Sequence, residues 1–272
     1  MPEIVEVEFL REEIYSTFVN RKVEEASLNK EDLSNVTSNE ISTLLENQKL
    51  LLTDRVGKVL TLSFSNDINL IIHFLLTGFT RLIDKKDKEN YQFYIVFDNN
   101  KILGISGIMK PGFIKLYKTN NIYTIDEIKK LGVDVLSKNF TLDKFKILLR
   151  ENCKKSIKEV LIDQEKLAGL GNAYTDEILF LSKIHPKRKC KDISNEEIEN
   201  LYKNIFTVIE LGKKYGGASE LSFVHLNGEK GKFHLHFNVH KRENQKCPVC
   251  GDLIESIKIG GRTSYFCPKC QR

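Results

Sequence analysis

Hydrophobic residues change their spacing along the chain, and each spacing predicts a different kind of element. Near the N-terminus they recur every three or four positions, at Val7, Leu10, Ile14 and Phe18. This periodicity predicts one amphipathic helix over residues 4–19, and Pro2 stands at its start, where a helix tolerates proline best. Short segments rich in Val, Ile, Phe, Tyr and Thr come next and predict antiparallel strands over residues 58–64, 70–74, 92–97, 101–105 and 113–117.

Beyond residue 117 the strand pattern gives way to helical periodicity. It predicts helices over residues 141–150, 156–167, 173–184 and 194–213. Ser194 and Glu197 have the spacing of a capping box, which fixes the start of the last helix. Asn172 follows Gly169-Leu170-Gly171 and directly precedes a predicted helix, so we expect it at the helix N-cap. The fold class that follows is α+β, with the strands mostly before the helices.

Two Cys-x-x-C pairs close the chain: Cys247, Cys250, Cys267 and Cys270. Each pair can supply two thiolates to one tetrahedral metal while the intervening segment forms a hairpin, which is the pattern of a zinc ribbon. We therefore predict one structural zinc ion, with Gly260-Gly261 as the tight hairpin turn. The alternative is a redox dithiol, which would need one Cys-x-x-C beside a strand–helix turn.

Composition narrows the functional class only slightly. The 272 residues are enough for two domains plus a small metal module. Lys and Arg total 42 against 37 for Asp and Glu, and the net charge of +5 permits a polyanionic partner without requiring one. The N-terminus lacks the apolar core of a secretory signal, and no apolar stretch is long enough to span a bilayer, so we expect a cytoplasmic protein.

Pro2 offers unusual chemistry if Met1 is removed, which the small second residue favours. The product is a secondary α-amine, and α-amino groups titrate at about 7.7 to 8.0, far below a lysine side chain. The positive end of the predicted helix would lower this pKa further. Such an amine can attack a sugar aldehyde carbon to give an iminium, as lysine does in Schiff-base enzymes. The simpler interpretation of Pro2 is a helix starter.

Three other residues could act near that amine. Glu3 and Glu6 lie three apart, and a carboxyl with a like-charged neighbour has a raised pKa that suits general acid catalysis. The alternative is that both glutamates only complement the helix dipole. Lys58 stands at the entrance to a predicted strand and is a candidate contact to phosphate or substrate, although lysines in such positions are usually solvated.

Two residues in the second half of the chain are candidate phosphate ligands. Asn172 would lie beside the free backbone N–H groups of a helix N-terminus, which bind anions. Arg262 follows the predicted turn and would stand at the tip of a β-ribbon, from which it could reach a groove or a phosphate. The alternatives are an ordinary helix cap and an ordinary solvated turn charge.

Together these residues resemble the formamidopyrimidine-DNA glycosylase and endonuclease VIII family of base-excision repair enzymes, over nearly the full length. The resemblance rests on Pro2-Glu3-Ile4-Val5-Glu6-Val7-Glu8, Gly57-Lys58, Leu161-Ile162-Asp163-Gln164, Gly169-Leu170-Gly171-Asn172-Ala173-Tyr174-Thr175-Asp176-Glu177, Ile184-His185-Pro186, Gly261-Arg262-Thr263-Ser264 and Cys267-Pro268-Lys269-Cys270-Gln271. The stretch 164–177 and the final ribbon are highly specific to this family. Their combination with Pro2 makes a chance match implausible.

The resemblance implies three domains. They are an N-terminal antiparallel β-sandwich with the catalytic helix over residues 1–125, a helix-two-turns-helix domain over residues 126–238, and a zinc finger over residues 239–272 that grips DNA across the cleft. The implied partner is double-stranded DNA that contains damaged bases or abasic sites. We expect a monomer that binds no membrane.

The resemblance also implies a role for each candidate residue. Pro2 is the nucleophile, Glu3 protonates the sugar ring oxygen, and Lys58 is a phosphate and catalytic contact. Asn172 and Arg262 match the family's phosphate clamps around a nucleotide that is flipped out of the stack. The implied reaction is loss of the base followed by β- and δ-elimination, which nicks the strand on both sides of the sugar.

Two loops depart from the family pattern. The family usually has His-x-x-Met-Ser/Thr-Gly, whereas this chain has His73-Phe74-Leu75-Leu76-Thr77-Gly78. Leu76 thus replaces the methionine that fills the gap left by the flipped base, as a stiffer apolar wedge. The usual Asp-Pro-Arg-Arg-Phe-Gly loop corresponds only loosely to residues 107–113, where Lys110 is the candidate DNA contact. The opposite-base preference stays open.

Three functional hypotheses follow. The leading one is a bifunctional glycosylase and abasic-site lyase for oxidised purines such as 8-oxoguanine and formamidopyrimidines, because the segment 216–233 looks more like the purine-lesion branch. The second is the same chemistry with an endonuclease VIII-like preference for oxidised pyrimidines. The third is a damaged-DNA-binding protein that has lost catalysis, but a pure binder has no physical need for an N-terminal proline amine.

Overall fold

The computed structural model describes residues 2–272, and the chain divides into two compact units. One unit comprises the N-terminal part up to Lys130 together with Tyr215–His234. The other comprises Leu131–Lys214 together with Leu235–Arg272. The chain therefore returns to the first unit for one internal segment. Within the described residues, no helix is both long enough and apolar enough to cross a membrane.

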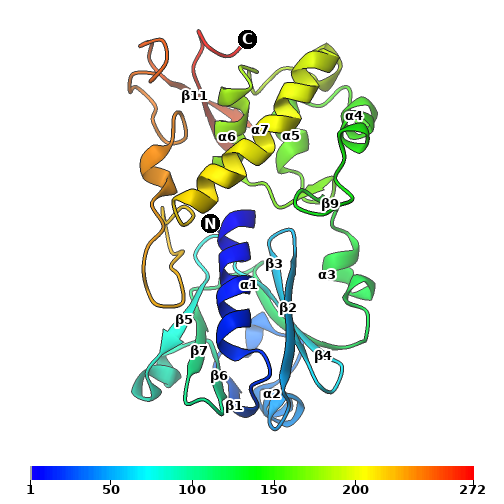
Figure 1. Ribbon diagram of the computed structural model, residues 1–272, viewed down its shortest axis with the longest axis vertical. Helices are drawn as coiled ribbons and strands as arrows, with labels where there is room; N and C mark the ends of the chain where they lie inside the picture. Colours follow the sequence, from blue (N-terminus) through cyan, green and yellow to red (C-terminus); the bar gives the residue numbers. More distant parts are fainter. Residues whose placement is uncertain (1) are drawn as a thin grey trace. The chain divides into compact units, whose positions relative to one another are not determined.

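The first unit contains helix α1 and two four-stranded sheets (Figure 1). One sheet has the order β2-β3-β4-β8, formed by Leu50–Val56, Val59–Phe64, Ile68–His73 and Phe113–Lys118. The other has the order β1-β6-β7-β5, formed by Val23–Leu28, Phe93–Phe97, Ile102–Ser106 and Phe79–Ile83. Every strand pair in both sheets is antiparallel, which confirms the predicted sheet structure.

Helix α1 (Ile4–Phe18) packs its apolar face into the core of this unit. The four residues that gave the helical periodicity are fully buried: Val7, Leu10, Ile14 and Phe18. The helix contacts β2 and β3 of one sheet, and the Phe18 ring lies 4.4 Å from the Phe97 ring of the other. Packing against both sheets holds the first turn of α1 in a fixed place.

The hydrophobic pattern missed four elements of the first unit: β1, β2, β5 and helix α2 (Ser38–Leu45). In the strands, charged or polar side chains interrupt the apolar positions, such as Glu24 and Glu25 in β1 and Arg81 in β5. Helix α2 buries Ile41 and Leu45 on one face but is only eight residues long. By contrast, the predicted strands start and end within two residues of β3, β4, β6, β7 and β8. Helix α3 (Asp126–Lys129) ends the N-terminal part of the unit.

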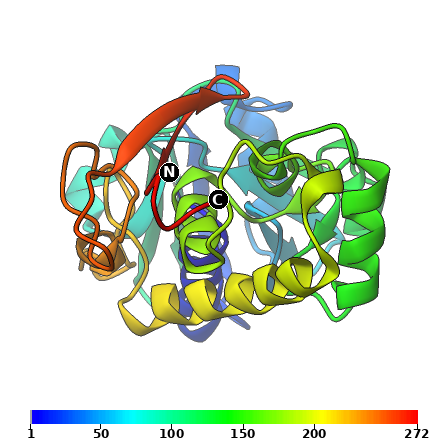
Figure 2. The same cartoon turned by 90° about the horizontal axis from the view of Figure 1, so that it is seen from above.

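The second unit is built on helices and a C-terminal ribbon. Its helices are α4 (Leu142–Glu151), α5 (Ile157–Ile162), α6 (Asn172–Leu181) and α7 (Asn195–Lys214), and its ribbon strands are β11 (Glu255–Ile259) and β12 (Arg262–Phe266). Figure 2 shows α6 between the long helix α7 and the ribbon, and α6 contacts both. The predicted capping box of α7 is confirmed, because Ser194 and Glu197 exchange hydrogen bonds of 2.8 and 3.2 Å.

Two predicted helices of this unit are too long. The helix predicted over residues 156–167 ends at Ile162, because Leu167–Ala168 (β10) pairs in parallel with Val133–Asp134 (β9). The helix predicted over residues 173–184 ends at Leu181, and Lys183 then adopts a φ of 58°, a left-handed conformation that cannot continue a helix. In both cases an apolar residue a few positions past the helix end, Leu167 or Ile184, extended the predicted helix.

Candidate functional site

The first turn of α1 buries two carboxylates beside Pro2. Pro2, Glu3 and Glu6 are all buried, and Glu3 is the N-cap of the helix. Glu3 and Glu6 form a reciprocal capping box, in which the Glu3 backbone N–H donates to Glu6 Oε2 at 2.8 Å. Both acidic side chains thus satisfy N–H groups at the positive end of the helix. The pair therefore complements the positive end of the helix dipole, as the alternative interpretation of the two glutamates expects.

Glu6 also holds a segment that lies far away in the sequence. Its Oε1 accepts a hydrogen bond of 2.7 Å from the backbone N–H of Ala218. Gly217, with a φ of 78°, precedes this contact, and a Cβ there would lie 3.0 Å from Glu6 Oε1. The Gly216-Gly217 pair is the sequence signal for this close approach. Periodicity alone did not predict that Glu6 has a second partner.

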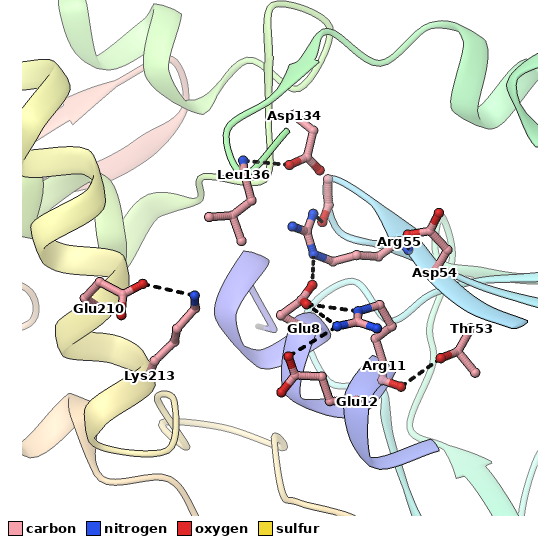
Figure 3. Close-up of polar contacts among 11 residues, drawn as sticks. Glu8, Arg11, Glu12, Thr53, Asp54, Arg55, Asp134, Leu136, Glu210 and Lys213 are labelled. Carbon is pink, nitrogen blue, oxygen red and sulfur yellow. Dashed lines mark hydrogen bonds and ion pairs between the residues drawn. The ribbon is translucent and has the colours of Figure 1, made fainter. Parts of the chain in front are cut away.

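Lys58 follows a tight turn that an ion-pair network ties to α1 (Figure 3). Gly57 has a φ of 59° in the turn between β2 and β3. Arg55 donates to Glu8 Oε2 of α1 at 2.6 Å and to the Gly57 carbonyl at 3.3 Å. Arg11 donates to the other oxygen of Glu8, also at 2.6 Å. The network therefore fixes the turn that carries the buried Lys58 against the helix that carries Pro2.

Electrostatics keep Glu8 ionised in this network. Burial raises the pKa of the Glu8 carboxyl, but hydrogen bonds and charge from Arg11 and Arg55 outweigh burial, and the pKa lies below its usual value. The Arg55 side chain is only 6% exposed, so this is a nearly buried ion pair. Removing either partner would leave a charge in the core, which is costly.

His73 joins the candidate residues of the first unit, although the sequence did not single it out as a functional residue. It ends β4 and pairs in register with Val59, the residue after Lys58. Burial, followed by the positive charge of Lys58, lowers the pKa of His73 to about 4. The imidazole is therefore neutral at physiological pH, beside a lysine. The sequence could have pointed to His73 only through the pairing of its strand, β4, with β3, the strand that follows Lys58.

The two loops that depart from the family pattern pack on each other. Thr77 donates to the Gly107 carbonyl at 2.6 Å, which joins the loop after β4 to the loop after β7. Leu76 in the first loop is 47% exposed and Met109 in the second is 51% exposed. Lys110 is also exposed and lies 3.7 Å from Asp32. The joined loops thus present two apolar side chains and a lysine to solvent.

In the second unit, Asn172 occupies a position one residue from the predicted one. The N-cap of α6 is Gly171, and Asn172 is the first residue of the helix, so the N-cap prediction is wrong. Its side-chain Nδ2 donates to the Thr263 carbonyl of β12 at 2.7 Å. Thr263 follows Arg262, so this bond joins one predicted phosphate ligand to the residue beside the other. A side-chain amide at the first helical position can bond to another strand because it is not needed as a cap.

A buried charge network lies beneath Asn172. Lys158 and Asp176 are fully buried, and Lys158 Nζ donates to Asp176 Oδ1 at 2.6 Å and to the Asn172 carbonyl at 3.0 Å. His240 Nδ1 lies 2.6 Å from the other oxygen of Asp176. Glu177 accepts the backbone N–H groups of Val239 and His240. This network fixes the start of α6, and sequence reasoning did not identify Lys158 as part of it.

Arg262 stands where the sequence predicted it. Gly260 and Gly261 have φ values of 54° and 76°, which is the pattern of a type I′ hairpin turn. Arg262 begins β12 directly after this turn and is exposed. At the other end of the ribbon, Gln271 accepts from the Cys267 N–H at 2.8 Å and donates to the Ile184 carbonyl at 3.0 Å. The ribbon is therefore fixed at its base and exposed at its tip.

The four sulfur atoms of the two Cys-x-x-C pairs converge. All four lie within 4.8 Å of one another, and the closest pairs are 3.4 Å (Cys250–Cys267) and 3.8 Å (Cys247–Cys270). Tetrahedral zinc with Zn–S bonds of about 2.3 Å requires sulfur atoms about 3.8 Å apart, so donor type and spacing both fit. Phe180 of α6 packs against this cluster. The predicted structural zinc site is confirmed.

Comparison with known proteins identifies the family. Three family profiles match: the formamidopyrimidine-DNA glycosylase N-terminal domain over residues 1–113, the formamidopyrimidine-DNA glycosylase H2TH domain over residues 131–223, and the zinc finger found in FPG and IleRS over residues 244–272. The formamidopyrimidine-DNA glycosylase of Lactiplantibacillus plantarum is 31% identical over 279 residues, which cover 100% of each chain. The chain belongs to the formamidopyrimidine-DNA glycosylase family.

Other members of the formamidopyrimidine-DNA glycosylase family agree with this assignment. The Pelotomaculum thermopropionicum protein is 33% identical over 276 residues, which cover 100% of this chain and 99% of its own. Two solved structures of Lactococcus lactis Fpg, each 29% identical over 100% of both chains, have TM-scores of 0.90 and 0.89. One is a complex with DNA that contains an abasic site, and the other is a complex with DNA that contains N7-benzyl-Fapy-dG.

Proposed function

We propose that this protein is a DNA glycosylase of base-excision repair that also cleaves the abasic site. Family membership supports the glycosylase activity. The observation that carries the proposal is the first turn of α1, where Pro2 and Glu3 are buried together and the turn before Lys58 is tied to the same helix. The DNA complexes of the Lactococcus lactis protein support damaged double-stranded DNA as the partner.

In the proposed reaction, the secondary amine of Pro2 attacks the sugar carbon that carries the damaged base. Glu3 protonates the ring oxygen, the base leaves with the electrons of the glycosidic bond, and an iminium joins Pro2 to the opened sugar. The iminium then withdraws electrons as β- and δ-elimination expel the phosphates on both sides. The helix dipole supports the first step, because it disfavours the protonated amine and keeps more of Pro2 nucleophilic.

Other residues are assigned to DNA binding in this proposal. Asn172 and Arg262 bind phosphates beside the flipped nucleotide, since Asn172 bonds to Thr263, the residue after Arg262, and Arg262 is exposed. Leu76 and Met109 supply the apolar wedge that occupies the space of the flipped base, and Lys110 contacts the strand nearby. Exposed apolar side chains on two loops that brace each other are suited to insertion between bases.

For the substrate, we propose oxidised purines, namely 8-oxoguanine and formamidopyrimidines. The names of the relatives and the formamidopyrimidine lesion bound by the Lactococcus lactis protein support this choice. The segment 215–234 supports it as well, because it resembles the purine-lesion branch and hydrogen-bonds to α1 beside the proposed catalytic residues. An endonuclease VIII-like preference for oxidised pyrimidines is the second candidate, and the replaced wedge residue Leu76 favours it.

A cleavage assay on matched duplexes distinguishes these functions. Three duplexes of one sequence would carry 8-oxoguanine, an oxidised pyrimidine or an abasic site, and product ends would be analysed on a sequencing gel. We expect cleavage of the 8-oxoguanine and abasic duplexes, with phosphates on both sides of the gap. Faster cleavage at the oxidised pyrimidine would support the second candidate. Tight binding without cleavage of any duplex would support a non-catalytic damaged-DNA-binding protein.

A further inference from the structure

The segment 215–234 is attached to α1 by two carboxylates that lie two helical turns apart. Glu6 accepts the backbone N–H of Ala218 at 2.7 Å, and Glu13 accepts the backbone N–H of Leu226 at 2.8 Å. Residues seven apart share one face of a helix, so both attachments use the same side of α1. The side chain of His225 strengthens the second attachment, because its Nδ1 lies 2.5 Å from Glu13 Oε1.

The hydrogen-bond partners of His225 require a protonated ring. Nδ1 faces the Glu13 carboxylate, and Nε2 lies 2.9 Å from the backbone carbonyl of Gly216. A carboxylate and a carbonyl only accept hydrogen bonds, so both ring nitrogens must donate, and only the imidazolium has two N–H groups. The rings of Phe9 and Phe223 pack against the imidazolium at centroid distances of 5.1 and 5.2 Å.

The charged groups around the ring favour the same protonation state. Glu13 approaches from α1, and Glu229 approaches from the segment itself. The hydrogen bond that His225 donates to Glu13 is the largest influence, and with these charges it raises the pKa of His225 against the opposing effect of burial. The resulting attachment is at full strength below pH 6.5, the ordinary value. It is lost as the pH rises through the raised pKa of the folded protein.

The segment borders the candidate site at two places. At one, Ala218 shares the Glu6 carboxylate with the backbone N–H of Glu3. At the other, Ser222 Oγ lies 3.3 Å from the Gly78 carbonyl, in the loop that carries Leu76. A shift of the segment would therefore reach both the proposed acid and the proposed wedge. His225 touches neither, so it would act by placing the segment.

We propose that protonated His225 is a positioning residue that locks the segment 215–234 onto α1, and that the lock opens at alkaline pH. Damaged-base excision then depends on the lock more strongly than cleavage of an abasic site, because the segment shares the Glu6 carboxylate with Glu3, the proposed acid of the base-loss step, and an abasic site has already lost its base. This second part rests on the proposed glycosylase function. The lock itself is a property of the free protein and can be tested without DNA.

The direct test follows the His225 ring and the Leu226 amide by NMR as the pH is raised. We expect the ring to titrate above 6.5 and the hydrogen-exchange protection of Leu226 to fall at the same midpoint, by about tenfold, as fits the loss of a charged hydrogen bond. Glu13→Gln should move the ring midpoint down. Glu12→Gln, which removes the same charge from the neighbouring exposed residue, should leave it in place. A ring that titrates at or below 6.5 in the unaltered protein would overturn the proposal.

The functional test measures the ratio of 8-oxoguanine excision to abasic-site cleavage across the same pH range. Titration of groups common to both reactions cancels in this ratio. We expect the ratio to fall with rising pH in the unaltered protein and to be low and flat in His225→Gln. If His225 had only a structural role, His225→Gln would lower the ratio by the same factor at every pH, so that its curve would run parallel to that of the unaltered protein. If neither substrate is cleaved, the proposed function fails while the NMR result still decides the lock.

Discussion

The zinc ribbon and the first turn of α1 reach fixed geometries by different routes. The ribbon is organised by residues close in sequence: two Cys-x-x-C pairs, a Gly260-Gly261 turn, and strands that pair across it. The first turn of α1 is organised by distant residues, since Glu6 bonds to Ala218 and Glu8 bonds to Arg55. A local motif can be identified in a sequence, whereas a site assembled by long-range contacts becomes visible only in the fold.

The largest difference between the two regions should appear when zinc is removed. A chelator should disorder residues 247–270, because structural zinc sites supply about 10 kcal/mol or more of folding free energy to small modules. The sheets of the first unit have their own core and should not respond. NMR spectra before and after chelation would compare ribbon amides with those of β3 and β4. Ribbon amides that keep their shifts without metal would show that the ribbon is not organised by zinc.

The long-range contacts of α1 should be sensitive to Arg55. The change Arg55→Met leaves the nearly buried Glu8 with only one cationic partner, so we expect a loss of about 3 kcal/mol in the free energy of unfolding. The matched control is Arg11→Met, which removes the other partner of Glu8 from a more exposed position and should cost about 1 kcal/mol. Urea unfolding measures both. Equal losses of unfolding free energy in the two variants would mean that the Arg55–Glu8 bond stabilises the fold no more than the Arg11–Glu8 bond does.

His73 adds a pH dependence to the stability of the first unit. Its pKa is about 4 in the fold and 6.5 ordinarily, so the unfolded chain binds more protons between these values. Stability should therefore fall as the pH drops from about 6.5 towards 4, by about 1.4 kcal/mol per pH unit. Unfolding of the protein and of His73→Phe, measured from pH 4 to 8, should differ in slope only below 6.5. Parallel curves throughout would contradict the buried, neutral state.

The smallest expected effect is that of Arg262, whose proposed role is a single phosphate contact to DNA. The change Arg262→Ala should leave the fold intact, since the side chain is exposed, and should weaken DNA binding. The slope of log affinity against log salt should decrease in magnitude by about 0.9, as expected for one phosphate contact. Lys203→Ala, an exposed charge on α7, is the matched control. An unchanged slope for Arg262→Ala would remove the proposed clamp.

These cases also explain how far the sequence could be interpreted. Periodicity predicted α1 and five strands, because each buries a regular apolar face, and the cysteine spacing with the Gly260-Gly261 turn predicted the ribbon. Periodicity missed β1 and β5, where charged residues interrupt the pattern. The sequence also placed Asn172 at the N-cap of α6, whereas the N-cap is Gly171, one residue earlier. Lys158 and His225 could not be identified in advance. Their importance comes from partners 18 and 212 residues away in the sequence, which no local pattern specifies.

The central claim is that the amine of Pro2 is the nucleophile, and borohydride trapping tests it most directly. The protein would be incubated with a duplex that carries 8-oxoguanine, reduced, digested, and analysed by mass spectrometry, after a check that Met1 is absent. We expect a covalent adduct at residue 2. The adduct should be largely lost in Pro2→Gly, because the primary glycine amine reacts more slowly, and retained at reduced yield in Glu3→Gln. An adduct at another residue, or none despite Met1 removal and tight DNA binding, would contradict the account.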